Sequence, residues 1–161
     1  MMRIFLTLFA LISFNAHAFE AKVIAVHDGD TITVMNDKGA NEKIRLYRAD
    51  APEIAYTIYG KHVDQQPYAA ESRAALASLC MSKTATLTRY GKSYGRTVAY
   101  VSCGGVDVAT YQIENGNAWA YRYTATKRLK QLQAVSKASG IGLWALPTPI
   151  EPRLWRQGVK P

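Results

Sequence analysis

The chain has 161 residues, 48% of them hydrophobic, and a formal net charge of +8. This length and hydrophobic content predict a single domain with a core of its own. No internal repeat or low-complexity stretch interrupts the chain, which excludes a repeat architecture. The positive charge favours polyanionic partners, nucleic acid foremost, with solubility alone as the alternative explanation.

The first 18 residues have the pattern of a secretory signal peptide. A positive start, MMR, precedes an apolar run from Ile4 to Phe14, and AHA (16–18) has the small-x-small pattern that signal peptidases cut after. The apolar run is well short of the ~20 residues that span a bilayer. No cysteine near the cut offers a lipid anchor. We therefore expect cleavage after Ala18 and a secreted or periplasmic protein, periplasm being favoured, with no membrane attachment after cleavage.

The chain contains two cysteines, Cys80 and Cys103, and their spacing is not that of a CxxC motif. An even number of cysteines in an oxidising compartment favours a structural disulfide, worth on the order of 3 kcal/mol. Two isolated buried thiols are the alternative.

Alternating sequences predict five strands in two groups. AKVIAVH, TITVM and EKIRLYR, between residues 21 and 48, are separated by DGD and NDKGAN and predict a three-stranded meander. TATLTRY (84–90) and TVAYVSC (97–103) predict two more strands, joined by GKSYGR.

A helix is expected between the two groups, where Pro67 precedes YAAESRAALASLC. VATYQIEN and TKRLKQLQAVSKAS, ended by Gly116 and Gly140, predict two more helices. A helix between the third and fourth of five strands is the OB-fold arrangement. The expected fold is α+β, mainly β: a five-stranded OB-fold barrel with about three helices over residues 19–146. Residues 147–161 are rich in proline and are expected to run extended over the surface.

The stretch HDGDTITV (27–34) contains two aspartates that have two interpretations. Asp-Gly between β-branched residues is typical of a tight turn, because glycine tolerates positive φ and aspartate hydrogen-bonds its own backbone. Alternatively, Asp30 after this turn and Asp50 after the third strand meet at one end of a small barrel. Their carboxylates would then share one hard cation with backbone carbonyls and water.

Three charged residues near these aspartates suit phosphodiester hydrolysis, which needs phosphate neutralisation, an activated water and donors for the developing charge. Glu53, three residues after Asp50, is a candidate to orient or deprotonate water. Arg45 points away from the core on the third strand, and Arg96 ends the GKSYGR loop; both are candidates to grip phosphate oxygens. A solvated arginine or a simple turn is the ordinary alternative for each.

His27 and His62 are the other candidates for a general base, since imidazole titrates near neutrality. No companion histidine, asparagine or metal-ligand spacing supports either of them. Glu53 is therefore the preferred candidate.

In chain order, DGDT, R-L-x-x-x-D-x-P-E, Y-G-R-x-x-A-Y, GNAWAY and GLW resemble the thermonuclease, or staphylococcal nuclease-like, family. The resemblance extends from about Lys22 to Trp144. It implies a five-stranded OB barrel and calcium-dependent cleavage of single- and double-stranded DNA and of RNA toward 3′-phosphate ends.

The resemblance also implies roles for individual residues. By position, these are the Ca²⁺ ligands Asp30, Asp50 and, through its backbone carbonyl, Ala51, the catalytic Glu53, and the phosphate-gripping Arg45 and Arg96. Asp28 is expected to serve the turn or to support a ligand, and Gly29 to make the bend.

Base-stacking tyrosines transfer less directly, because the register of GNAWAYRY is ambiguous. Tyr94, Tyr121 and Tyr123 are the candidates, with packing at the barrel rim as the alternative. Aromatic faces stack on any base, which is consistent with low sequence preference.

The chain departs from the family pattern at two places. Arg48 and Ala49 stand where a small or aliphatic pair is common, so Arg48 adds positive charge near the predicted metal site. Weaker cation binding and an additional phosphate contact are both open consequences. Lys92 and Ser93 replace an acidic-basic pair, which leaves the setting of the Arg96 loop open.

The sequence thus predicts a monomeric, metal-dependent nuclease that acts on DNA and RNA. The first alternative is an OB-fold module that binds nucleic acid without cutting it, and the second is a surface protein that binds other polyanions. The joint presence of five site side chains in the family's order favours the nuclease.

Overall fold

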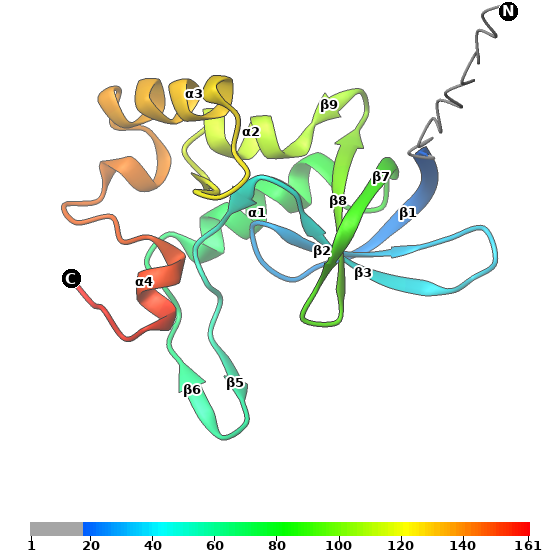
Figure 1. The fold of residues 1–161 in the computed structure, drawn as a ribbon, viewed down its shortest axis with the longest axis horizontal. Coiled ribbons are helices and arrows are strands. Elements are labelled where there is room, and N and C mark those ends of the chain that lie inside the picture. Colours follow the sequence, from blue (N-terminus) through cyan, green and yellow to red (C-terminus); the bar gives the residue numbers. More distant parts are fainter. Residues whose placement is uncertain (1–17) are drawn as a thin grey trace, which may run out of the picture.

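A computed structural model describes residues 18–161, and Figure 1 shows a barrel at one side of the molecule with helices and the C-terminal segment at the other. The barrel strands pair in the order β3-β2-β1-β7-β8, and a parallel pairing of β3 with β8 closes the ring. Their bounds are β1 Ala18–Val26, β2 Thr31–Met35, β3 Asn41–Leu46, β7 Thr84–Ser93 and β8 Arg96–Cys103. The predicted five-stranded barrel is confirmed.

The barrel core consists of the apolar residues that alternate along these strands. Val23, Ile32, Val34, Ile44 and Leu87 are all fully buried. Since successive side chains of a strand point to opposite faces, the polar residues between them point outward. The hydrophobic alternation therefore predicted the inward face correctly.

Within residues 18–161, four α-helices and one 3-10 helix lie mainly to one side of the barrel (Figure 1). They are α1 Ala69–Cys80, α2 Val108–Glu114, α3 Lys127–Ala138, α4 Pro152–Arg156 and the 3-10 helix η1 Gly142–Ala145. Asp107 caps α2 by accepting from Thr110 N (2.7 Å), and Thr126 caps α3 by accepting from Leu129 N (3.3 Å). The first three helices match the predicted ones, whereas α4 was not predicted.

Several short elements complete the fold. The two-residue strand β4 (Ala49–Asp50) pairs with β10 (Trp119–Ala120), and β5 (Tyr56–Ile58) forms a hairpin with β6 (Lys61–Val63). β9 (Val106–Asp107) adds to the edge of β8. β4 matters most, because it carries Asp50.

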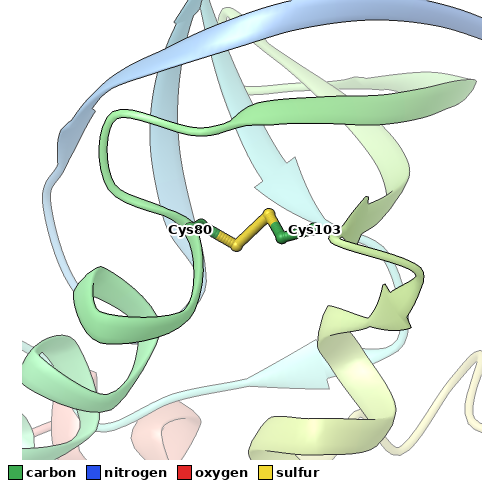
Figure 2. Close-up of a disulfide and its surroundings, with 2 residues drawn as sticks. All are labelled: Cys80 and Cys103. Carbon is green, nitrogen blue, oxygen red and sulfur yellow. A yellow bond between two sulfur atoms is a disulfide. The ribbon is translucent and has the colours of Figure 1, made fainter.

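The predicted disulfide between Cys80 and Cys103 is confirmed (Figure 2). Cys80 is the last residue of α1 and Cys103 the last residue of β8, and their Cα atoms are 5.5 Å apart. Both cysteines are buried. The bridge ties the first helix to the end of the last barrel strand.

The prediction that the proline-rich tail runs extended over the surface is wrong for its central part. Pro152 occupies the first turn of α4, a position that proline favours, and Trp155 in the same helix is buried. The Trp155 indole N–H donates to the carbonyl of Asp64 (2.8 Å). Burial of this aromatic ring holds the tail against the β5–β6 segment.

The predicted signal peptide lies outside the described residues, apart from Ala18. In the part that is described, residues 18–161, no helix has both the length and the apolar character required to cross a membrane.

Replacing both Cys80 and Cys103 by serine removes a cross-link between residues 23 positions apart. We expect the free energy of unfolding to fall by about 3 kcal/mol, because the unfolded chain regains loop entropy. Urea denaturation of the variant, beside wild type with and without dithiothreitol, measures this. Reduced wild type should lose a similar amount, and an unchanged midpoint in both samples would contradict the prediction.

Candidate active site

Strand register brings Asp30 and Arg45 together. Thr31 of β2 lies opposite Arg45 of β3, and Asp30 directly precedes Thr31. The backbone N–H of Leu46 also donates to the carbonyl of Asp30 (2.8 Å). The end of the first turn is thereby fixed against the end of the third strand.

The guanidinium of Arg45 joins the two predicted ligand carboxylates. Its Nη1 donates to Oδ1 of Asp30, and its Nη2 donates to Oδ1 of Asp50 (2.7 Å). The side chains are only 15%, 4% and 7% exposed for Arg45, Asp30 and Asp50. The alternative of a solvated arginine on the strand is therefore wrong. Both aspartates therefore lie within hydrogen-bond distance of one guanidinium.

Asp30 is held in its ionised form. Its Oδ2 accepts from the backbone N–H of Ala51 (2.7 Å), and its Oδ1 accepts from the hydroxyl of Thr31 (3.0 Å). Burial by itself would raise the pKa of Asp30, but the charge of Arg45 and these hydrogen bonds keep it below its ordinary value.

The neighbouring carboxylates show the opposite shift. Burial and the charge of Asp30 raise the pKa of Asp28 to about 7 and also raise the pKa of Asp50. The pKa of Glu53 is raised as well, first by burial, against the lowering effect of Arg156. Asp28 also accepts from the backbone N–H of Asp30 (2.9 Å), which confirms its predicted role in the turn. Burial is the first cause of each of these raised pKa values.

This donor set fits a hard divalent cation. Calcium prefers carboxylate and carbonyl oxygens, supplemented by water. Two buried aspartates share the guanidinium of Arg45, and burial together with the charge of Asp30 raises the pKa of Asp50. Within residues 18–161 there is no group of three or more His, Cys, Asp or Glu side chains placed to hold a metal ion. A site made of two carboxylates, one backbone carbonyl and water contains only two such side chains, so this finding does not bear on it.

Glu53 lies beside these aspartates and has a partner that sequence reasoning missed. Its Oε1 accepts from Nη1 of Arg156 in α4, whose Nη2 also lies 3.5 Å from Oδ2 of Asp50. The backbone N–H of Glu53 donates to the buried side chain of Gln66 (3.2 Å). The sequence did contain a signal for this contact: Trp155 precedes Arg156 in the proline-rich tail, and a large aromatic ring usually becomes buried, which indicates a packed segment.

Arg96 approaches the group from the β7–β8 hairpin. The strands extend to Ser93 and from Arg96, so Tyr94 and Gly95 alone form the turn, with φ of 48° and 75°. The predicted GKSYGR loop is therefore mostly strand. Nη1 of Arg96 lies 3.5 Å from the hydroxyl of Thr31, which itself bonds Asp30. Among the described residues Arg96 forms no ion pair, so its charge faces the site without a carboxylate partner.

Two of the three candidate tyrosines lie beside the carboxylates. Tyr121 and Tyr123 pack edge to face, with ring centroids 5.4 Å apart. They line a pocket of about 80 Å³ together with Asp50 and Arg156. Tyr94 is 96% exposed at the tip of its hairpin. Tyr123 is 70% exposed, and the Arg122 guanidinium lies 5.1 Å from its ring centroid.

Arg48 and the two histidines have other partners. The Arg48 guanidinium lies 5.0 Å from the ring centroids of both Tyr47 and Tyr100, and it makes no ion pair with a carboxylate of the described chain. His27 hydrogen-bonds Thr33 (2.8 Å), and the exposed His62 lies 3.4 Å from Asp64. None of these contacts involves Asp30, Asp50 or Glu53.

Gly29 is required for a reason other than the one predicted. Its φ is not among the positive ones, so backbone freedom does not explain it. A Cβ at Gly29 would lie 1.8 Å from Oγ of Ser72 and 2.7 Å from Cβ of Ala51. The turn that carries Asp30 packs directly against α1 and the segment after Asp50, which leaves no room for a side chain.

Comparisons with known proteins identify the family of the chain. The family model described as "Staphylococcal nuclease homologue" matches residues 43–146. A Haemophilus influenzae protein named as an uncharacterized endonuclease is 35% identical over 141 residues, 86% of this chain and 74% of that protein. An Escherichia coli uncharacterized endonuclease is 34% identical over 138 residues, covering 84% and 83% of the two chains. Micrococcal nuclease of Shigella flexneri is 27% identical over 155 residues, covering 88% and 83%.

The fold and the site together define a nuclease-type OB barrel with a carboxylate-arginine centre. The chain belongs to the staphylococcal nuclease family.

Replacing Gly29 by alanine should destabilise the protein by roughly 1–3 kcal/mol, because the new methyl group overlaps Ser72 and Ala51. Gly91→Ala is the matched control, since no atom lies within 4 Å of a Cβ built there. Thermal unfolding of both variants measures the difference. Equal midpoints for the two variants would contradict the close packing of the turn.

Proposed function

We propose that this chain is a calcium-dependent nuclease that hydrolyses phosphodiester bonds of DNA and RNA with low sequence preference and leaves 3′-phosphate ends. The observation that carries the proposal is the buried pairing of Arg45 with Asp30 and Asp50, with Glu53 beside it. Membership of the staphylococcal nuclease family supports the same reaction class.

Asp30 and Asp50 would hold the calcium ion through their carboxylates, and Ala51 through its backbone carbonyl. The ion would supply neutralisation of phosphate charge and polarisation of a phosphoryl oxygen. Asp30 is suited to this role because its carboxylate stays ionised and is oriented by Thr31 and Ala51.

Glu53 is the proposed base that orients and deprotonates the attacking water. Burial raises its pKa above the ordinary value, which brings its basicity closer to neutral pH. Arg45 and Arg96 would donate to the phosphate oxygens as charge develops in the transition state. Arg96 suits this role because no described carboxylate pairs with it.

Substrate strands would be held by charge and stacking. The net charge of +8 attracts the polyanion, and Tyr94, Tyr121 and Tyr123 offer ring faces for bases. Stacking and phosphate contacts carry little sequence information, so low sequence preference follows.

A secreted or periplasmic site of action is part of the proposal, as is a monomeric state. The Cys80–Cys103 bridge is favoured in an oxidising compartment, and the N-terminal sequence has the signal-peptide pattern. The rival, an OB-fold module that only binds nucleic acid, leaves the assembled carboxylates and arginines without a role.

Purified protein from Phe19 onward should degrade plasmid DNA and total RNA in calcium. Excess chelator should stop the reaction and added calcium should restore it, because the carboxylate pair needs the cation to engage phosphate. Gel electrophoresis measures the loss of intact substrate. Tight, salt-sensitive binding without degradation would support the binding module instead.

Glu53→Gln and Arg96→Ala should each lower kcat by about 10²–10³-fold, the usual cost of removing a group that stabilises developing charge. Lys38→Ala is the control for loss of one positive charge and matches Arg96→Ala, because Lys38 is part of the turn of the β2–β3 hairpin, and this turn lies at the far end of the barrel (Figure 1). Initial rates at saturating DNA and calcium measure the effect, with thermal midpoints to verify folding. Rates near that of wild type in both variants, with both folded, would contradict the catalytic roles proposed for Glu53 and Arg96.

A further inference from the structure

The C-terminal segment is docked onto the loop that carries Glu53, and Figure 1 shows α4 beside the stem of the β5–β6 hairpin. Trp155 is buried there and donates to the carbonyl of Asp64 (2.8 Å). Gln66, only 2% exposed, donates through Nε2 to the carbonyl of Ile150 (2.6 Å). Two independent hydrogen bonds from buried side chains therefore fix the position of α4.

The same buried glutamine fixes the backbone of Glu53. Its Oε1 accepts from the N–H of Glu53 (3.2 Å), and its own backbone N–H donates to the carbonyl of Glu53 (2.8 Å). Gln66 thus bonds Glu53 and the tail at the same time. The position of the tail and the backbone of Glu53 are therefore linked through one buried side chain.

The tail also supplies the side-chain partner of Glu53. Arg156, the last residue of α4, donates through Nη1 to Oε1 of Glu53. Within residues 18–161, Arg156 is the one side chain that hydrogen-bonds the Glu53 carboxylate. The contact of Arg156 with Asp50 is longer, 3.5 Å, at the limit of a hydrogen bond.

We propose that Arg156 is a positioning residue of the reaction: α4 carries it to the site so that its guanidinium fixes the orientation of the Glu53 carboxylate. This inference rests on the proposed nuclease function. A carboxylate that activates water acts only from the correct place, and misplacement by about 1 Å costs on the order of 10²-fold in rate. The opposite role, in which Arg156 competes with the cation at Asp50, is disfavoured because the Asp50 contact is the longer one.

The first test compares Arg156→Ala, Arg156→Lys and the charge-loss control Lys38→Ala at saturating calcium. Arg156→Ala should lower kcat by about 10- to 100-fold with KM changed less than about twofold, since the orientation of Glu53 affects the transition state more than binding. Arg156→Lys should recover part of kcat, because an ammonium still pairs with Glu53 but holds it through a single point. Thermal midpoints close to that of wild type verify that the variants remain folded.

A double-mutant cycle separates action through Glu53 from a direct phosphate contact. If Arg156 acts through Glu53, the variant Glu53→Gln with Arg156→Ala should be no more than about threefold slower than Glu53→Gln alone. Affinity for a fluorescent DNA oligonucleotide in excess chelator is the second readout. Arg156→Ala should weaken it no more than Lys38→Ala does.

Four results would overturn the inference. The first is a kcat of Arg156→Ala equal to that of Lys38→Ala, and the second is activity of Arg156→Ala at a lower calcium concentration than wild type needs. The third is a double variant in which the losses of the two single variants multiply. The fourth is a loss of oligonucleotide affinity in Arg156→Ala that exceeds the loss in Lys38→Ala. An inactive wild-type protein would instead remove the proposed function, and the inference with it. The two failures are therefore distinguished by the wild-type rate alone.

Discussion

The ion pairs of Arg45 with Asp30 and Asp50 are the contacts on which the rest of the site depends. All three side chains are at least 85% buried, and a buried charge is costly unless it is paired and hydrogen-bonded. Removing one partner of such a group typically costs about 3–5 kcal/mol, because the others are left uncompensated. Two buried carboxylates that share one guanidinium make this place suited to a divalent cation and to an anionic substrate held through it.

The barrel makes this arrangement rigid. The β2–β3 register sets Thr31 opposite Arg45, and pairing of β3 with β8 closes the ring behind them. Two-residue pairing of β4 with β10 then holds Asp50 in place. The turn at Gly29 fits only because it carries no side chain, so the packing of α1 and the position of Asp30 are coupled. The C-terminal tail contacts Glu53 directly through Arg156, and it is also connected to Glu53 through the side chain of Gln66.

The sequence predicted those parts whose patterns are long or ordered. Hydrophobic alternation gave the five strands, the cysteine pair gave the bridge, and the order of short motifs brought Asp30, Asp50 and Arg45 to one place. A strand of two residues is too short to show hydrophobic alternation, so β4 and β10 could not be predicted from the sequence. The five-residue helix α4 begins at a proline within a proline-rich segment, which favoured an extended tail; the burial of Trp155, a tertiary contact, decided otherwise. Arg156 was missed because the contact spans about a hundred residues of chain.

The central claim is that Asp30 and Asp50 form one cation site at the end of the barrel. A crystal structure of the protein from Phe19 onward, grown in calcium, tests it through the anomalous difference map. We expect a single peak about 2.3–2.6 Å from a carboxylate oxygen of each aspartate. A map in which Arg45 still joins the two carboxylates and calcium is absent from their vicinity, at a concentration that supports cleavage, would contradict the account.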